Sequence, residues 1–362
     1  MTDVFAVFEG GGIKGIAHVG ALARFQEETN LQFRGYAGTS AGAIVAALAA
    51  VGYRARNPSS RPFSITPQDL NMIMEQLDFA KLLGDGPVPF NKLRANIESF
   101  RSAIPRLVEA GKELQKLANA GKFKRWRSTR ALLQKYQPEL EMIQGLPDLL
   151  QRFSVKKGLY ETGALVTWLE GYLNRSGDRL TFQSLLDTNK IILKIVATDL
   201  RDPKPRVFGP IHSRNTEVAL AIQASISIPL CFCPYPEGSN LLVDGGLRSN
   251  YPLWIFDTER QESGVELPII GFRLQQDVEV HNYSKLEDYI WGLVNAALEG
   301  PSWLQRKGMK NVVEVRVPIP ANVRATSFDL GNMEKGYLFL SGYSAATAAL
   351  LNADNRAILG LT

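Results

Sequence analysis

An apolar segment, a glycine-rich turn and then a helix occur in this order twice within the first 51 residues. Val4 to Phe8 is a short Val- and Phe-rich run that stops at Glu9 and three glycines, which predicts a buried strand ending in a tight turn. A helix from about Lys14 to Glu28 should follow. The second unit has a strand at Phe33 to Ala37 and an apolar helix at Ala43 to Val51. Two such units predict strands that are packed against helices.

Further strands are predicted at 191–197, 241–243, 268–274 and 312–317, and a last helix from about Met333 to Leu351. This alternation indicates an α/β fold with a mainly parallel central sheet covered on both faces. The 362 residues, 45% of them hydrophobic, allow one large α/β domain or two ordinary ones. We expect a single domain over residues 1–362.

Residues 54–157 interrupt this alternation. Their apolar residues recur at helical spacing, and the segment has 19 Lys and Arg against 10 Asp and Glu. We therefore expect a basic helical insertion, acting as a cap or lid or facing a membrane. A dense basic run surrounds Trp126, from Lys122 to Tyr136. A solvated helix face would have the same composition, and nucleic acid binding is the least favoured use of this patch.

Several classes of protein and site are not indicated by the sequence. No apolar run reaches the ~18 residues needed to span a bilayer, and the start at Met1 has no secretory signal, so we expect a soluble cytoplasmic protein. Cys231 and Cys233 are one residue apart, where strand geometry would point them in opposite directions, so reduced thiols are expected. The three histidines form no ligand-spaced cluster with cysteine. We expect no metal and no cofactor.

A candidate nucleophile lies in the second glycine turn. Gly38-Thr39-Ser40-Ala41-Gly42 matches the pattern in which a serine sits on a sharp turn between a strand and a helix, with small neighbours that leave its hydroxyl exposed. The helix that follows places the positive end of its dipole where negative charge develops during acyl transfer. The pattern alone also fits an ordinary loop, and the flanking strand and helix favour the catalytic interpretation.

A serine nucleophile needs a base, and an aspartate is the stronger candidate here. Asp244-Gly245-Gly246 directly follows the apolar segment at 241–243, so the carboxylate should emerge at a strand end, with two glycines that permit close backbone approach. Asp-Gly-Gly is also a common turn sequence. His18 falls within the first predicted helix, where a packed or surface role is expected, and His212 and His281 lie in segments without other catalytic features.

The first glycine turn, Gly10-Gly11-Gly12-Ile13-Lys14-Gly15, allows two interpretations. It satisfies the G-x-G-x-x-G pattern of dinucleotide-binding proteins, which makes a nucleotide-binding oxidoreductase the main alternative. That pattern expects an acidic residue after the second strand, and here the strand runs into Gly38 instead. The other interpretation is an oxyanion site in which backbone N–H groups, assisted by Lys14, hold a developing negative charge. A catalytically silent binding module is the third alternative.

Taken together, these three segments resemble the patatin-like phospholipase family. Gly10 to Gly15 resembles the oxyanion loop of that family, Gly38 to Gly42 its nucleophile elbow, and Asp244 to Gly246 its catalytic aspartate. The segment 224–229 and two residues after the aspartate, Asn250 and Pro252, also resemble family positions. The resemblance implies a three-layer patatin-like fold and a Ser40–Asp244 dyad without a catalytic histidine or a metal.

The resemblance implies a substrate and a location as well. A lipid acyl hydrolase of phospholipase A type would release fatty acids from phospholipids and bind the membrane peripherally. Basic residues beside Trp126 would favour an anionic lipid surface. Because some bacterial members resemble switched effectors that degrade membranes, the insertion could alternatively respond to a regulatory ligand or a nucleotide signal. The sequence does not define the oligomeric state.

Overall fold

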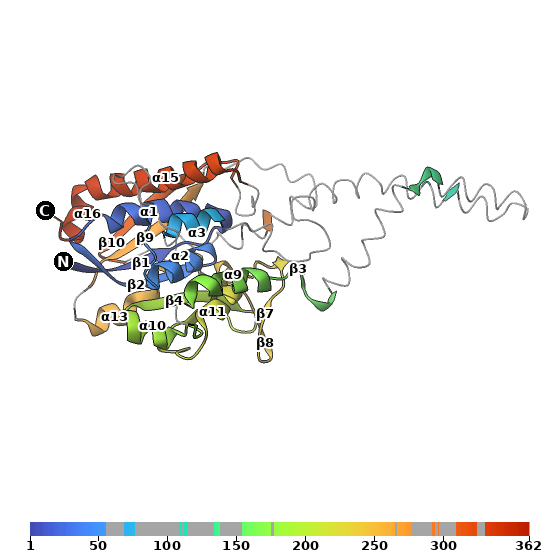
Figure 1. Cartoon of the computed structure of the whole chain (residues 1–362), viewed down its shortest axis with the longest axis horizontal. Coiled ribbons are helices and arrows are strands. Elements are labelled where there is room, and N and C mark those ends of the chain that lie inside the picture. The colour runs from blue at the N-terminus through green and yellow to red at the C-terminus, as the bar shows by residue number, and fades with distance from the viewer. Residues whose placement is uncertain are drawn as a thin grey trace, which may run out of the picture.

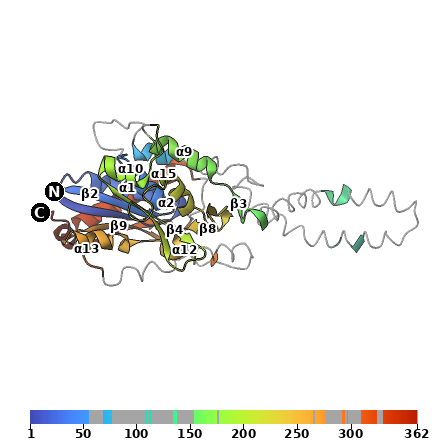
Figure 2. The same cartoon turned by 90° about the horizontal axis from the view of Figure 1, so that it is seen from below.

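The computed structural model describes most of the α/β body and a small part of the predicted insertion. The described residues are 1–55, 69–76, 154–174, 177–264, 266–276, 309–323 and 330–361, with 109, 112–113, 134–137, 292–293 and 296. Within them a central sheet lies between two layers of helices, and both chain ends lie at the same end of the sheet (Figures 1 and 2). The three-layer α/β fold expected from the sequence is confirmed.

The main sheet has eight strands, most of which are parallel. Its order is β10-β9-β1-β2-β4-β8-β7, with β5 paired to β4. The neighbours from β10 to β4 are parallel, whereas β5, β7 and β8 are antiparallel additions. The strands are β1 (Thr2–Phe8), β2 (Leu31–Thr39), β4 (Ile192–Asp199), β5 (Pro205–Phe208), β7 (Tyr235–Glu237), β8 (Asn240–Asp244), β9 (Ile269–Gln276) and β10 (Val312–Ile319). A separate two-stranded sheet pairs β3 (Gly158–Tyr160) with β6 (Leu230–Phe232).

Most helices cover one face of the sheet. They are η1 (Gly12–Gly15), α1 (Ile16–Gln26), α2 (Ala41–Ala50), α3 (Leu70–Gln76), α9 (Gly163–Leu173), α10 (Phe182–Asn189), α11 (Val218–Ser225), α15 (Asn332–Leu351) and α16 (Ala353–Ile358). The other face is covered by α12 (Gly246–Ser249), η2 (Leu253–Phe256) and α13 (Asp257–Glu262), as Figure 2 shows. The helix predicted from about Lys14 therefore begins as a short 3-10 turn and becomes α-helical at Ile16.

Two glycines bring α1 and α15 into direct backbone contact. A Cβ on Gly20 would lie 1.9 Å from the carbonyl oxygen of Phe339, and one on Gly342 would lie 1.9 Å from that of Ala17. No larger residue fits at either position without separating the helices. This close packing fixes α1, and with it the glycine loop that precedes α1, against the sheet.

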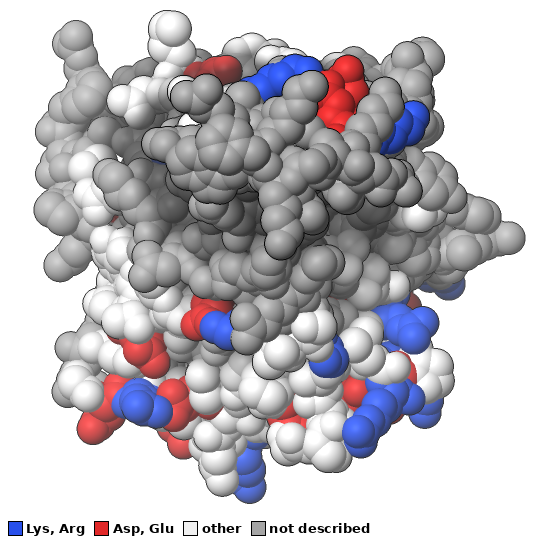
Figure 3. All heavy atoms as spheres, turned by 90° about the vertical axis from the view of Figure 1, so that its right-hand side faces the viewer, with Lys and Arg blue, Asp and Glu red and all other residues white. Residues whose placement is uncertain are grey.

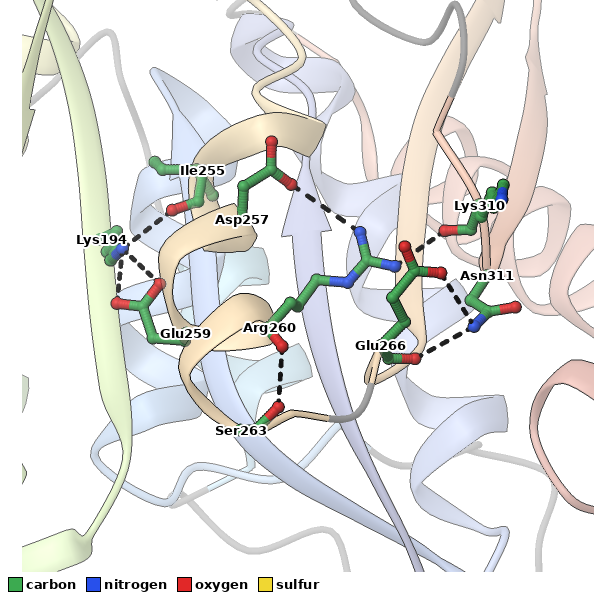
Figure 4. A network of polar contacts seen from close by, with 9 residues as sticks. All are labelled: Lys194, Ile255, Asp257, Glu259, Arg260, Ser263, Glu266, Lys310 and Asn311. Carbon is green, nitrogen blue, oxygen red and sulfur yellow. Dashed lines mark hydrogen bonds and ion pairs between the residues drawn. The ribbon is translucent and has the colours of Figure 1, made fainter.

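The opposite layer is fastened by polar contacts at both sides of α13 (Figure 4). Lys194 of β4 donates to the carbonyl of Ile255 at 2.8 Å and pairs with Glu259 at 2.6 Å. On the other side Arg260 donates to the carbonyl of Lys310 at 2.8 Å, just before β10. The Lys194–Glu259 pair is almost fully buried, so loss of one partner would leave an uncompensated charge. Asn250, at the end of α12, borders the site described below.

Most of the predicted insertion lies outside the described residues, including the run from Lys122 to Arg130. Of its described parts, α3 is helical and packs against α1, and Lys135 forms an ion pair with Glu113 at 3.0 Å. The helical, basic character of 54–157 as a whole therefore stays a prediction.

The described part of the chain also bears on the expected reduced cysteines and on the expected lack of a membrane-spanning helix. Cys231 is buried, Cys233 is half-buried, and neither forms a disulfide. Among the helices that the structure describes, none combines the length and apolar composition needed to cross a membrane.

Candidate active site

Ser40 occupies a strained turn between β2 and α2. Its backbone has φ 54° and ψ −124°, in the left-handed half of conformational space that residues with a side chain rarely adopt. The turn is closely packed on both sides, because a Cβ on Gly38 would lie 2.3 Å from the carbonyl of Gly42, and one on Gly42 would lie 2.5 Å from that of Phe8. Both predicted elbow glycines are thus required by packing, and Ser40 is the N-cap residue of α2 without a capping hydrogen bond from its side chain.

Ser225, at the end of α11, holds this strained turn in place. Its Oγ accepts a hydrogen bond from the Ser40 N–H at 2.8 Å and donates to the carbonyl of Val196 at 2.6 Å. Two residues later, the carbonyl of Ser227 accepts the N–H of Asp244 at 2.9 Å. One short segment therefore positions the backbones of both Ser40 and Asp244, a role that sequence reasoning did not assign to it.

Strand register places Ser40 and Asp244 on either side of β4. Thr39 is the β2 partner of Val196, and Asp244 is the β8 partner of Ala197, the next residue of β4. Because Ser40 directly follows Thr39, Ser40 and Asp244 lie beside the same residue of β4, Ala197. The side chain of Ala197 is only a methyl group. A Cβ on Gly245 would lie 2.2 Å from the carbonyl of Val196, so this glycine permits β8 to end close against β4.

The Asp244 carboxyl group is buried and has an altered acidity. Its Oδ1 accepts the N–H of Gly246 at 2.8 Å, whereas its Oδ2 has no hydrogen-bond partner of standard geometry within the described ranges. Burial raises the pKa of Asp244 to about 6, and the Ser40 side chain and the Gly246 N–H partly oppose this rise. A carboxylate with a pKa near 6 is ionised at neutral pH and is a better proton acceptor than an ordinary aspartate.

The backbone N–H groups of the glycine loop after β1 differ in whether they already donate a hydrogen bond within the protein. Gly10 donates its N–H to the carbonyl of Asn250 at 2.9 Å, so that N–H is already engaged. A Cβ on Gly10 would also lie 2.3 Å from Asn250 Oδ1. Gly12 has φ 56°, which suits glycine, and the N–H groups of Gly11 and Gly12 donate to no other described residue. Among the described residues, therefore, no hydrogen-bond partner occupies the N–H groups of Gly11 and Gly12, which makes these two the candidate oxyanion donors.

The other two predicted members of the loop have different surroundings. The Lys14 Nζ donates to Gln276 Oε1 at the end of β9, at 2.9 Å. Gly15 faces the elbow, where an added Cβ would lie 3.0 Å from the Cβ of Ala41. In this structure Lys14 thus contacts β9, and Gly15 permits η1 to approach the start of α2.

His18 is a buried, neutral residue beneath the glycine loop. Its Nε2 lies 2.8 Å from the carbonyl of Glu9, which can only accept, so the proton is on Nε2. Burial lowers the pKa of His18 to about 4, although the hydrogen bond to Glu9 opposes this. Of the packed and surface roles expected for His18, the structure shows the packed one, and His212 is exposed. His281 lies outside the described residues.

Sequence comparisons relate the chain to known proteins. The sequence matches the family described as patatin-like phospholipase over residues 6–257, a range that contains the glycine loop, Ser40 and Asp244. It is 28% identical over 278 residues to the uncharacterized protein YqhO of Bacillus subtilis, covering 74% of this chain and 70% of YqhO.

Two solved structures show more distant similarity. VipD from Legionella pneumophila has a TM-score of 0.49 at 18% identity, with 96% of this chain and 66% of VipD covered. ExoU of Pseudomonas aeruginosa, solved in a heterodimeric complex with SpcU, has a TM-score of 0.41 at 18% identity, with 99% of this chain and 52% of ExoU covered. The chain thus spans about two thirds of one of these proteins and half of the other.

The family match covers more than half of the chain. Of the two functions that the glycine loop left open, it favours a hydrolase over a nucleotide-binding oxidoreductase. This chain belongs to the patatin-like phospholipase family of lipid hydrolases.

Proposed function

We propose that this protein is a serine acyl hydrolase that releases fatty acids from phospholipids, with Ser40 as nucleophile and Asp244 as general base. The observation that carries the proposal is the pairing of a serine on a strained strand-to-helix turn with a buried aspartate whose pKa is raised to about 6. Strained backbone and shifted acidity both occur preferentially at catalytic sites.

In the first step, Ser40 Oγ attacks the carbonyl carbon of an acyl ester while Asp244 takes the hydroxyl proton. Oδ2 of Asp244 accepts no hydrogen bond of standard geometry from a described residue and is suited to this role, since Oδ1 accepts the Gly246 N–H. Collapse of the tetrahedral intermediate breaks the bond to the leaving alcohol oxygen, which receives the proton from Asp244. The acyl group then remains as an ester on Ser40.

Negative charge on the former carbonyl oxygen is stabilised by backbone N–H groups. We assign this role to Gly11 and Gly12, because the N–H of Gly10 is engaged with Asn250. The start of α2 contributes its positive dipole end at the same place. Loss of one such donor raises a catalytic barrier by about 2.7–4 kcal/mol.

In the second step, water attacks the acyl ester and gives its proton to Asp244. The intermediate collapses, Ser40 leaves as the alcohol after recovering that proton, and the fatty acid is released. The same carboxyl group thus acts as base and acid in alternation.

A serine-directed fluorophosphonate probe tests the nucleophile without assuming a lipid. The wild type should be labelled at Ser40, and Ser40→Ala should not be labelled. Ser227→Ala is a matched control, since it removes a nearby buried serine hydroxyl whose hydrogen bond is to the Gln223 carbonyl. Labelling of Ser40→Ala at the wild-type rate would contradict the proposal.

We also propose peripheral binding to membranes. The basic run from Lys122 to Arg130 favours an anionic surface. The face in Figure 3 shows Lys, Arg, Asp and Glu intermingled among its described residues, so these give no basic patch of their own. An apolar contribution is offered by α15, where Met333, Tyr337 and Leu340 are exposed at helical spacing.

Liposome flotation with and without anionic lipid tests this surface. Binding should depend on anionic lipid and decrease with salt, since exposed charges are screened within about 10 Å at 0.1 M salt. Replacement of the Lys122–Arg127 basic residues by Gln should abolish that dependence. Binding that is indifferent to lipid charge and salt would contradict the electrostatic part of the proposal.

A further inference from the structure

A polar cavity of about 330 Å³ adjoins the glycine loop on the side of β9 and β10. Gly10 and Asn250 form the wall nearest the proposed oxyanion donors, since Gly10 directly precedes Gly11. Arg273 of β9 and Arg316 of β10 form another part of the wall. The cavity lies at the carboxyl ends of parallel strands, where α/β sheets bind their ligands.

The two arginines lie side by side, and among the described residues their guanidinium groups have more N–H donors than acceptors to bind them. Arg273 and Arg316 occupy paired positions on the adjacent parallel strands. They share one buried carboxylate, Glu314, which lies 2.6 Å from Arg316 Nε and 3.8 Å from Arg273 Nη1. Within the described ranges, the terminal N–H groups of both guanidinium groups have no hydrogen-bond partner. Among the described residues, one carboxylate for two cations leaves a net positive charge and unused guanidinium donors beside the cavity.

The rest of the lining adds positive charge. Lys14 borders the same cavity, with its Nζ on Gln276 Oε1. The acidic member, Glu9, uses its carboxylate to accept the N–H of Leu274 at 2.7 Å. The described part of the lining therefore has three cations and one anion, and the carboxylate of that anion accepts a backbone N–H. Planar guanidinium groups bind phosphate oxygens through paired hydrogen bonds, a geometry that suits this pair of arginines.

We propose that this cavity binds a phosphate group, and that its physiological ligand is the head-group phosphate of the phospholipid substrate. This rests on the proposed function. In a glycerophospholipid only the glycerol backbone separates the phosphate from the acyl esters, so a phosphate site must adjoin the oxyanion site. The cavity meets this requirement because the glycine loop forms part of its wall. Arg273, Arg316 and Lys14 would thus select lipids that carry a phosphate.

The test uses two short-chain substrates that differ only in the head group, dihexanoylphosphatidylcholine below its micellar concentration and dihexanoylglycerol. In Arg273→Gln/Arg316→Gln, kcat/KM for the phosphate-bearing lipid should fall by about 10-fold or more, mainly through KM, since a charge-assisted hydrogen bond contributes about that factor. The value for dihexanoylglycerol should change by less than about twofold. Arg214→Gln removes an exposed arginine that does not line the cavity, and it should leave both values unchanged.

Other outcomes would overturn the proposal in distinguishable ways. Equal loss on both substrates would mean that the arginines are only structural. If the double variant does not fold, the single variant Arg273→Gln is assayed on the same two substrates. This substitution disturbs only the 3.8 Å contact between Arg273 and Glu314. If the wild type cleaves neither substrate, the proposed function fails. Stabilisation by inorganic phosphate in the wild type but not in the double variant would then assign the cavity to free phosphate and refute the head-group assignment.

Discussion

The hydroxyl group of Ser225 accepts the backbone N–H of Ser40 at 2.8 Å and thereby fixes the one strained residue on which the proposed chemistry depends. The two residues are 185 positions apart in the sequence. The same hydroxyl donates to Val196 of β4, so the elbow is tied to the strand that separates Ser40 from Asp244.

Ser225→Ala should therefore impair both stability and catalysis. It leaves the buried Ser40 N–H without the Ser225 acceptor, at a cost of about 1–3 kcal/mol in the free energy of unfolding. We expect a lower Tm and a reduced kcat at unchanged KM. Ser227→Ala removes a similar hydroxyl but keeps the backbone carbonyl that binds Asp244, so it should retain most activity. Equal behaviour of the two variants would contradict a specific role for Ser225.

The pKa of Asp244 predicts the pH dependence of the reaction. The base must be ionised, and its pKa is about 6. Below that value kcat/KM should fall about tenfold per pH unit, and above pH 7 it should be constant. A soluble short-chain ester, assayed between about pH 4.5 and pH 8, avoids effects of pH on lipid surfaces. A flat profile over this range would show that Asp244 is not the base.

Asp244→Asn should stabilise the fold at neutral pH while abolishing activity. The native pKa of about 6 lies above the ordinary 3.8, so ionisation of the buried carboxyl group opposes folding above pH 6. Removal of that charge should raise the free energy of unfolding by up to about 3 kcal/mol, from the 1.36 kcal/mol per pKa unit. The gain should disappear as the pH falls from about 6 to about 4. Tm measurements across this range would show the trend, and a lower Tm of the variant at pH 8 would contradict it.

Substitution of His18 tests whether a histidine, and not Asp244, is the general base. It is neutral, and its Nε2–H supports the Glu9 carbonyl before the glycine loop. His18→Gln can still supply an N–H, so we expect kcat to fall by less than about tenfold, whereas loss of a general base typically lowers rates by about 10²–10⁴. His18→Leu cannot donate and should be less stable by about 1–3 kcal/mol. If His18→Gln folds and is as inactive as Ser40→Ala, the base would be His18 and not Asp244.

Local signals located the main elements and the proposed dyad. The strands predicted at Val4 to Phe8 and at 312–317 are apolar and are observed within two residues at each end, as β1 and β10. Ser40 and Asp244 are proposed as the dyad because each follows an apolar strand and is flanked by glycines, and the structure shows that packing requires these glycines. These features are encoded within a few residues of each other.

Long-range contacts could not be predicted in the same way. The engagement of the Gly10 N–H by Asn250 depends on the loop after Asp244 folding back across the end of β1. The pairing of Arg273 with Arg316 required the register of β9 and β10, which no local pattern specifies. The antiparallel direction of β8 was likewise not evident from its short apolar sequence.

The most direct measurement of the central claim is fatty-acid release from phosphatidylcholine by the wild type, Ser40→Ala, Asp244→Asn and His18→Gln, each checked for folding. We expect Ser40→Ala and Asp244→Asn to lose activity by about 10³-fold or more and His18→Gln to stay within about tenfold of the wild type. Near wild-type turnover by Asp244→Asn would contradict the Ser40–Asp244 dyad.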